Sequence, residues 1–176
     1  MLAPGSTRGL PPTAIVVPPH LQVALGEIGV IEDIRPGRSN PRIEQYHALT
    51  AAGAAVDDVS WCASYVGWCL EMAGIKSTRS KSAASYATWG EPCLDTVLRD
   101  GSWVYDPSTM FGAVALMAKF DKDAGGTGHV GFLMGVSGTD IFLCGGNQDN
   151  RVSIAVRKKA NVVALRRAPK LAALLA

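Results

Sequence analysis

Several features that would point to common functions are missing from this chain. It has four cysteines among 176 residues but no C-x-x-C pair, so the sequence does not favour a structural zinc site. No run of about 18 apolar residues occurs, which argues against a transmembrane helix. Prolines interrupt the apolar part of the first residues, which therefore do not resemble a secretory signal. We expect a protein made in the cytoplasm, with free thiols, no metal, no cofactor and no membrane insertion.

Acidic residues are absent from the last part of the chain. No Asp or Glu follows Asp149, and the net charge of the whole chain is only +2. The basic residues after that point are Arg151, Arg157, Lys158, Lys159, Arg166, Arg167 and Lys170. A solvated charged face is the simpler interpretation of this basic end, and weak attraction to an anionic surface is the alternative.

The remaining composition is that of an ordinary globular domain, with 48% hydrophobic and 18% charged residues. We expect a proline-rich arm over residues 1–18, one domain over 19–170 and a short tail over 171–176. Helical spacing and helix-start signals come first, and alternating apolar segments follow. Helices are predicted near residues 19–28, 41–52, 61–73 and 83–89, and strands near 102–105, 112–119, 129–136, 140–144, 152–156 and 162–165. This order predicts an α+β fold in which an antiparallel sheet packs on the third helix.

Cys62 stands in the first turn of the third predicted helix, directly after a polar loop. Ser60 is the expected N-cap, since its hydroxyl can accept from a free backbone N–H. The unpaired N–H groups and the positive end of the helix dipole would favour a thiolate at Cys62. The alternative is that Cys62 is a small apolar residue of the core, as we expect for Cys69.

A cysteine nucleophile needs a histidine, and the chain has three. His129 is the best placed, because a strand holds it and the glycine-rich run 125–128 precedes it, whereas His20 and His47 lie on helices. Asn147 follows the neighbouring strand, so a hairpin would bring it back beside His129. Its amide oxygen could then accept from the imidazole and fix the tautomer.

These residues lie within motifs that resemble the CHAP / NlpC-P60 superfamily, and more narrowly the small CHAP-like peptidoglycan hydrolases of phage endolysins and related bacterial proteins. The motifs span about residues 20–168. They are Gly26–Val30, Asn40–Ile43, Trp61–Val66, Trp68–Leu70, Ala73–Ile75, Gly128–Phe132 and Gly145–Gln148.

The resemblance implies a papain-like α+β fold and a residue for each catalytic role. Cys62 would be the nucleophile, His129 the general base and acid, and Asn147 the orienting residue, with Gln148 as the alternative third member. Trp61 and Gln148 are also predicted to contact substrate. The backbone N–H of Cys62 and a donor from Asp57, Ser60 or Trp61 would form the oxyanion hole. Many CHAP domains carry an acidic residue near the third position, and this chain has Gly145, Gly146 and Asn147 there.

The predicted function is therefore hydrolysis of an amide in the cell-wall stem peptide. Both an N-acetylmuramoyl-L-alanine amidase and a peptidoglycan endopeptidase fit the resemblance. The expected partner is peptidoglycan, reached in the periplasm or outside the cell after release, by a monomer that binds no nucleic acid. Three alternatives stay open: an antagonistic amidase toxin with an immunity protein, a non-catalytic wall-binding module, and an acyltransferase.

Overall fold

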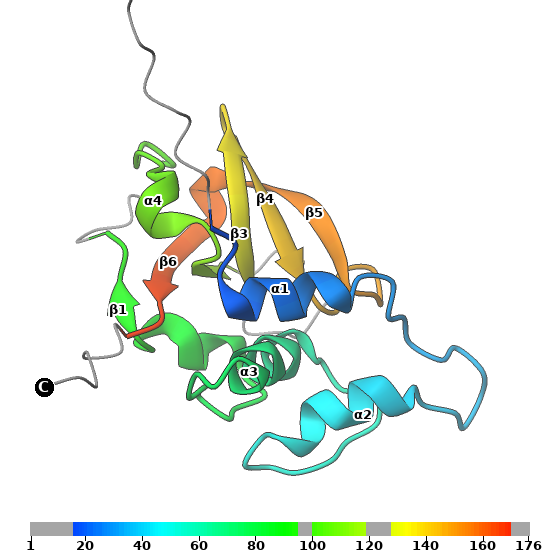
Figure 1. The fold of residues 1–176 in the computed structure, drawn as a ribbon. Coiled ribbons are helices and arrows are strands. Elements are labelled where there is room, and N and C mark those ends of the chain that lie inside the picture. The colour runs from blue at the N-terminus through cyan, green and yellow to red at the C-terminus, as the bar shows by residue number, and fades with distance from the viewer. Residues whose placement is uncertain (1–15, 95–99, 119–127, 170–176) are drawn as a thin grey trace, which may run out of the picture.

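The computed structural model describes residues 16–94, 100–118 and 128–169, and it combines helices with one antiparallel sheet (Figure 1). The helices are α1 (Pro19–Gly26), α2 (Pro41–Ala48), α3 (Cys62–Met72), η1 (Ala83–Ala87), α4 (Pro107–Met110) and η2 (Lys159–Asn161). The strands are β1 (Glu91–Pro92), β2 (Val114–Met117), β3 (His129–Ser137), β4 (Asp140–Gly145), β5 (Ser153–Lys158) and β6 (Val162–Arg167). The predicted mixture of early helices and a later antiparallel sheet is confirmed.

The sheet has the strand order β1-β6-β2-β3-β4-β5, and every pair is antiparallel. β3 lies between β2 and β4, with Met117 opposite His129 and Phe132 opposite Cys144. His129 is the first residue of its strand, so its position is fixed by the ladder on one side only. This end of β3 is where the predicted site residues gather.

Helix α3 packs on the sheet beside α1 and α2 (Figure 1). Tyr65 of α3 meets Phe132 of β3 edge-on at a ring distance of 6.4 Å, and its hydroxyl donates to the Ala24 carbonyl of α1. One buried cluster joins these helices to the sheet. A second cluster contains Leu133, Leu143, Ile141, Met117 and Leu165. Burial of these apolar side chains is the main source of the fold's stability.

Polar contacts fix the helices to one another. The Glu27 carboxylate receives two hydrogen bonds from the Arg42 guanidinium, at 2.7 and 2.6 Å, and one from the Tyr46 hydroxyl at 2.6 Å. The Arg42 guanidinium also stacks over the Trp68 ring at 4.4 Å. α1, α2 and α3 are thus tied together at one point by a bidentate ion pair and a cation–π contact.

Three local predictions are wrong. Residues 102–105 form no strand, since Trp103 is buried while Val104 is exposed and no strand of the described residues pairs with them. Residues 83–87 form the 3₁₀-helix η1 instead of an α-helix to residue 89. Ser60 does not cap α3, because Trp61 occupies the N-cap position and makes no capping hydrogen bond.

Some predictions fall outside the described residues. These are most of the arm over residues 1–18, the tail over 171–176, Lys170, the end of the strand predicted over 112–119, and residues 125–127 of the glycine-rich run. Of the helices that the structure describes, none combines the length and the apolar character needed to cross a bilayer.

Candidate active site

Cys62 is the first residue of α3, and its thiol faces the start of β3. The side chain is 3% exposed. The backbone N–H of Val130, the residue directly after His129, and the Ser60 hydroxyl both act on the thiol in the direction that lowers its pKa. The start of α3 therefore places the thiol next to the strand that carries the imidazole. The Ser60 hydroxyl acts on the thiol and does not cap the helix.

Burial raises the pKa of the Cys62 thiol above its ordinary value, and the hydrogen bonds from Val130, from Ser60 and from the backbone at the helix start oppose that rise. The expectation that the helix dipole leaves a thiolate is therefore not met in the free protein. At neutral pH the resting group is a thiol, and it needs a base to ionise.

His129 is held as a neutral imidazole. Burial is the largest cause that lowers its pKa, to about 4, and the positive charge of Arg157 lowers it further. The Gln148 side chain opposes both effects by a hydrogen bond. A neutral imidazole can accept a proton and can therefore act as a general base.

Gln148 lies in the bend between β4 and β5, and it is 1% exposed. Its Nε2 group donates to three backbone carbonyls, those of Leu143 at 3.1 Å, Gly145 at 3.2 Å and Ser153 at 2.7 Å. These bonds fix the amide, so the carbonyl oxygen must point the other way. Oε1 of Gln148 and Nε2 of His129 are both buried and have no other partner among the described residues, and we infer that each is the partner of the other.

Gly145 makes this approach possible. A Cβ atom at position 145 would lie 3.2 Å from His129 Nε2 and 3.3 Å from Gln148 Cδ, which is too close for most contacts. The last residue of β4 therefore leaves room for the imidazole and the amide to meet.

Asn147 is placed differently from its predicted role. It is half-buried and has a φ of 56°, in the left-handed region that asparagine tolerates better than most residues. Within the described residues its side chain makes no hydrogen bond. The structure therefore brings Gln148, and not Asn147, to His129. Adjacent residues in a bend point in different directions, and the sequence has no signal that tells which one faces the imidazole.

Trp61 lies in the interior and does not line an open groove. It is 0% exposed, its indole N–H donates to Glu32 Oε1 at 2.7 Å, and its ring packs near Tyr46 at 6.0 Å. Gln148 is equally buried. A buried side chain is not accessible to substrate, so burial disagrees with the substrate-contact roles predicted for Trp61 and Gln148. Both side chains instead pack beneath the site. No sequence signal marked Glu32 as the partner of Trp61.

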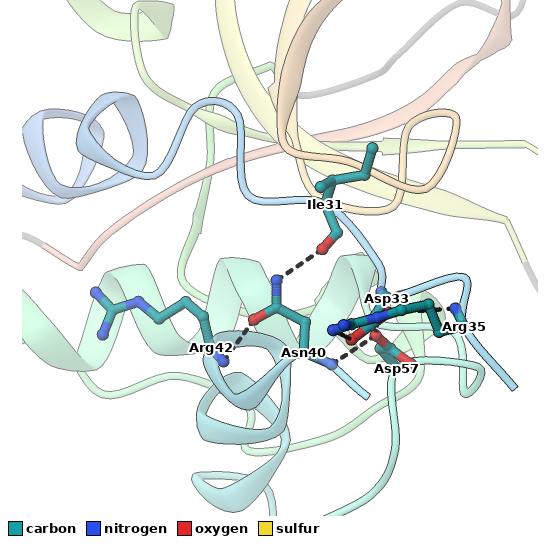
Figure 2. A network of polar contacts seen from close by, with 6 residues as sticks. All are labelled: Ile31, Asp33, Arg35, Asn40, Arg42 and Asp57. Carbon is teal, nitrogen blue, oxygen red and sulfur yellow. Dashed lines mark hydrogen bonds and ion pairs between the residues drawn. The ribbon is translucent and has the colours of Figure 1, made fainter. Parts of the chain in front are cut away.

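Asp57 fastens the loop that leads into α3. Its Oδ2 atom accepts from the backbone N–H groups of Asp33, at 2.8 Å, and Asn40, at 2.7 Å, as Figure 2 shows. Asn40 in turn donates to the Ile31 carbonyl and caps α2 through the N–H of Arg42. Oδ2 of Asp57 thus joins this loop to two other backbone segments. Of the predicted second oxyanion donors, Ser60 and Trp61 are nearest in sequence to the thiol.

The other two histidines are buried, and each contacts a different polar group. His20 Nε2 contacts the Gly112 carbonyl at 2.8 Å, and His47 Nδ1 contacts the Ser64 hydroxyl at 2.9 Å. Across the described ranges, no three His, Cys, Asp or Glu side chains gather in a way that could hold a metal ion. Cys69 and Cys144 are 0% exposed and belong to the core.

The basic end is partly used in folding. Arg167 pairs with Glu91 of β1 at 3.0 Å, Arg166 donates to the Ala87 carbonyl, and Lys159 lies over the Trp103 ring at 4.6 Å. These contacts tie β6 and η2 to neighbouring segments. Attraction of the basic end to an anionic surface stays a prediction. Whether or not it occurs, Arg167, Arg166 and Lys159 also have a structural role.

No protein-family model matches the chain, and no curated protein sequence matches it. Among solved structures, the chain is similar to a Staphylococcus aureus protein described as similar to a lipoprotein of the NLP/P60 family. The TM-score is 0.44 and the identity 15%, over 94% of this chain and 45% of that chain. This chain thus spans less than half the length of that protein.

Proposed function

We propose that the chain is a cysteine hydrolase of peptidoglycan, with Cys62 as nucleophile, His129 as base and acid, and Gln148 as the orienting residue. One observation carries the proposal. The Cys62 thiol meets the backbone beside His129, and the imidazole of His129 meets a glutamine that three carbonyls hold in place. A thiol, an imidazole and a fixed amide are the parts of a cysteine acyl-transfer site.

The reaction begins from a neutral pair. The Nε2–H of His129 donates to Gln148 Oε1, which leaves Nδ1 as the basic nitrogen. Nδ1 takes the Cys62 proton as the sulfur attacks the amide carbonyl, and the resulting oxyanion is stabilised by the free N–H groups at the start of α3. The imidazolium then protonates the leaving amine, and a thioester remains on Cys62. Water, deprotonated by the same nitrogen, attacks the thioester and releases the carboxylate product.

The resemblance of the motifs around Cys62, His129 and Gly145–Gln148 to CHAP and NlpC-P60 hydrolases supports the substrate class. The bond is an amide of the stem peptide, either the lactyl–L-alanine bond or a peptide bond further along. We propose a lytic enzyme of the endolysin type, which acts on the wall after release from the cytoplasm. Its papain-like fold is part of the same proposal, and the antiparallel sheet packed on the nucleophile helix is what supports it.

The test is mass spectrometry of fragments released from purified sacculi. Cys62→Ala is compared with wild type, and Cys93→Ala serves as the matched control because Cys93 is half-buried and lies apart from the proposed machinery. We expect fragments from wild type and Cys93→Ala only. Free stem peptides would indicate an amidase, and shortened or uncross-linked muropeptides an endopeptidase.

Other results would contradict the proposal. Equal release by Cys62→Ala would exclude the cysteine mechanism. No release from several wall types, with the folded protein still sedimenting with sacculi, would instead indicate a wall-binding module. Tight inhibition by a protein encoded beside it would favour the antagonistic toxin, which uses the same chemistry.

A further inference from the structure

A second histidine lies behind the nucleophile helix and touches the segment on both sides of Cys62. His47, near the end of α2, is 0% exposed, and its Nδ1 atom is 2.9 Å from the hydroxyl of Ser64. Ser64 is 1% exposed and lies in the first turn of α3, two residues after Cys62. This contact is the side-chain hydrogen bond that joins α2 to the first turn of α3 within the described residues.

The opposite side of the ring faces the loop before the helix. The backbone carbonyl of Val59, three residues before Cys62, acts on the His47 imidazole as a hydrogen-bond acceptor does, and among the described residues the buried Nε2 atom has no other partner. His47 is itself fixed, because the Thr50 hydroxyl donates to its carbonyl at 2.7 Å and the Thr50 N–H donates at 2.9 Å. The imidazole is thus a rigid spacer between residues 59 and 64.

This arrangement requires a neutral ring of one tautomer. With its proton on Nε2, directed at the Val59 carbonyl, His47 can accept from Ser64 at Nδ1. Burial is the largest cause that lowers the pKa of His47, and the positive charge of Lys81 acts in the same direction. The Val59 carbonyl and the Asp57 carboxylate oppose them. At neutral pH the ring is therefore uncharged and the bond from Ser64 is intact.

We propose that His47 is a positioning residue that holds the Cys62 thiol in register, through Ser64 on one side and Val59 on the other. The inference rests on the proposed role of Cys62 as nucleophile. Ser60, whose hydroxyl acts on the thiol, directly follows Val59. Movement of this loop therefore changes how the Ser60 hydroxyl and the Val130 N–H act on the thiol. Loss of these interactions raises the pH at which the thiol ionises.

The experiment measures the rate at which iodoacetamide alkylates Cys62, site by site with peptide mass spectrometry, from pH 6 to 10. Ser64→Ala removes the bond to His47. Ser77→Ala is the matched control, since Ser77 is also a buried serine whose hydroxyl makes a hydrogen bond, to Glu71 at 3.0 Å, near the C-terminal end of α3. We expect Ser64→Ala to raise the midpoint by about one pH unit, which lowers the rate at pH 7 about tenfold, and Ser77→Ala to leave the midpoint unchanged.

A double variant keeps the test decisive if Ser64→Ala is unstable. His47→Leu with Ser64→Ala removes the donor and the acceptor of this bond together, so that neither is left without the other. The variant should fold, yet it lacks the connection. A wild-type midpoint in either folded variant would overturn the inference. Because alkylation needs no peptidoglycan, a shifted midpoint in a protein that releases nothing from sacculi would retain the positioning role while the proposed function fails.

Discussion

Gly146 lies directly against the indole ring of Trp61. A Cβ atom at position 146 would come within 2.5 Å of Trp61 Cζ3 and 2.8 Å of Tyr65 Cβ. The bend that carries Gln148 is therefore pressed onto the start of the nucleophile helix with only a hydrogen atom between them. This contact sets the distance between the helix that holds the thiol and the bend that holds the orienting amide.

Gly146→Ala should harm both folding and catalysis. The added methyl group forces the bend away from Trp61, at a cost of about 1–3 kcal/mol in the free energy of unfolding. Hydrolysis of sacculi should fall further than the loss of folded protein explains, because Gln148 moves with the bend. Urea denaturation and turbidity decrease at matched folded concentration measure the two effects.

Gly26→Ala is the control for this substitution. Gly26 ends α1, where a methyl group would meet no other atom within 4 Å and where the helical backbone favours alanine. It should be neutral or slightly stabilising. If Gly146→Ala and Gly26→Ala had the same free energy of unfolding, the bend would move away from Trp61 without a loss of stability, which contradicts the prediction.

Gln148 and Asn147 can be separated as orienting residues. Gln148→Leu removes the acceptor for His129 Nε2 and also the donor to the carbonyls of Leu143, Gly145 and Ser153, so kcat is compared at matched folded concentration. It should lower kcat about 100-fold with a smaller effect on KM, because misorientation of the base weakens the chemical step. Asn147→Gly removes the neighbouring side chain and suits the φ of 56° at that position. It should keep near wild-type kcat. The reverse result would assign the orienting role to Asn147.

Arg157 tunes the acid limb of the activity profile. Its positive charge lowers the pKa of His129, after burial, and the pKa lies at about 4. We expect the acid limb of kcat/KM for the free protein near this pH, well below that of an ordinary histidine. Arg157→Gln should shift the limb upward. Lys158→Gln, which removes an equal charge from the neighbouring residue, should leave it in place, and an equal shift in both variants would point to a non-specific charge effect.

His20 makes the fold sensitive to mild acid. Burial lowers its pKa, and the Gly112 carbonyl opposes this. The unfolded chain binds a proton at His20 near pH 6.5, and the folded chain binds it only at lower pH, so stability is lost as pH falls through that window. His129 and His47 contribute with the same sign.

His20→Gln should reduce this acid sensitivity, because glutamine can still donate to Gly112 but does not titrate. Between pH 6.5 and 5 the slope of unfolding free energy against pH should fall by up to about 1.4 kcal/mol per unit. Thermal melts and urea titrations at fixed ionic strength measure it. An unchanged slope would mean that His20 is protonated without cost in the folded state.

Periodicity and helix-start residues predicted much of the fold from the sequence. Asn40-Pro41 marks the start of α2, Gly74 follows α3, and the alternation over 129–136 and 140–144 marks β3 and β4. These signals are local, since they depend on backbone geometry and on the period of apolar residues. The segment 102–105 has the same pattern but pairs with no strand in the described part of the chain, and pairing is not a local property.

The sequence by itself determined the order of elements, and it placed Cys62 at a helix start and His129 at a strand start. It had no means of choosing between Asn147 and Gln148, or of showing that Trp61 is buried. It also held no sign that His47 touches Ser64. Only the tertiary structure decided these points, because the direction of a side chain in a bend, its burial and its pKa depend on packing between segments far apart in the chain. The helix dipole at Cys62 is a local effect, and the burial that outweighs it is not.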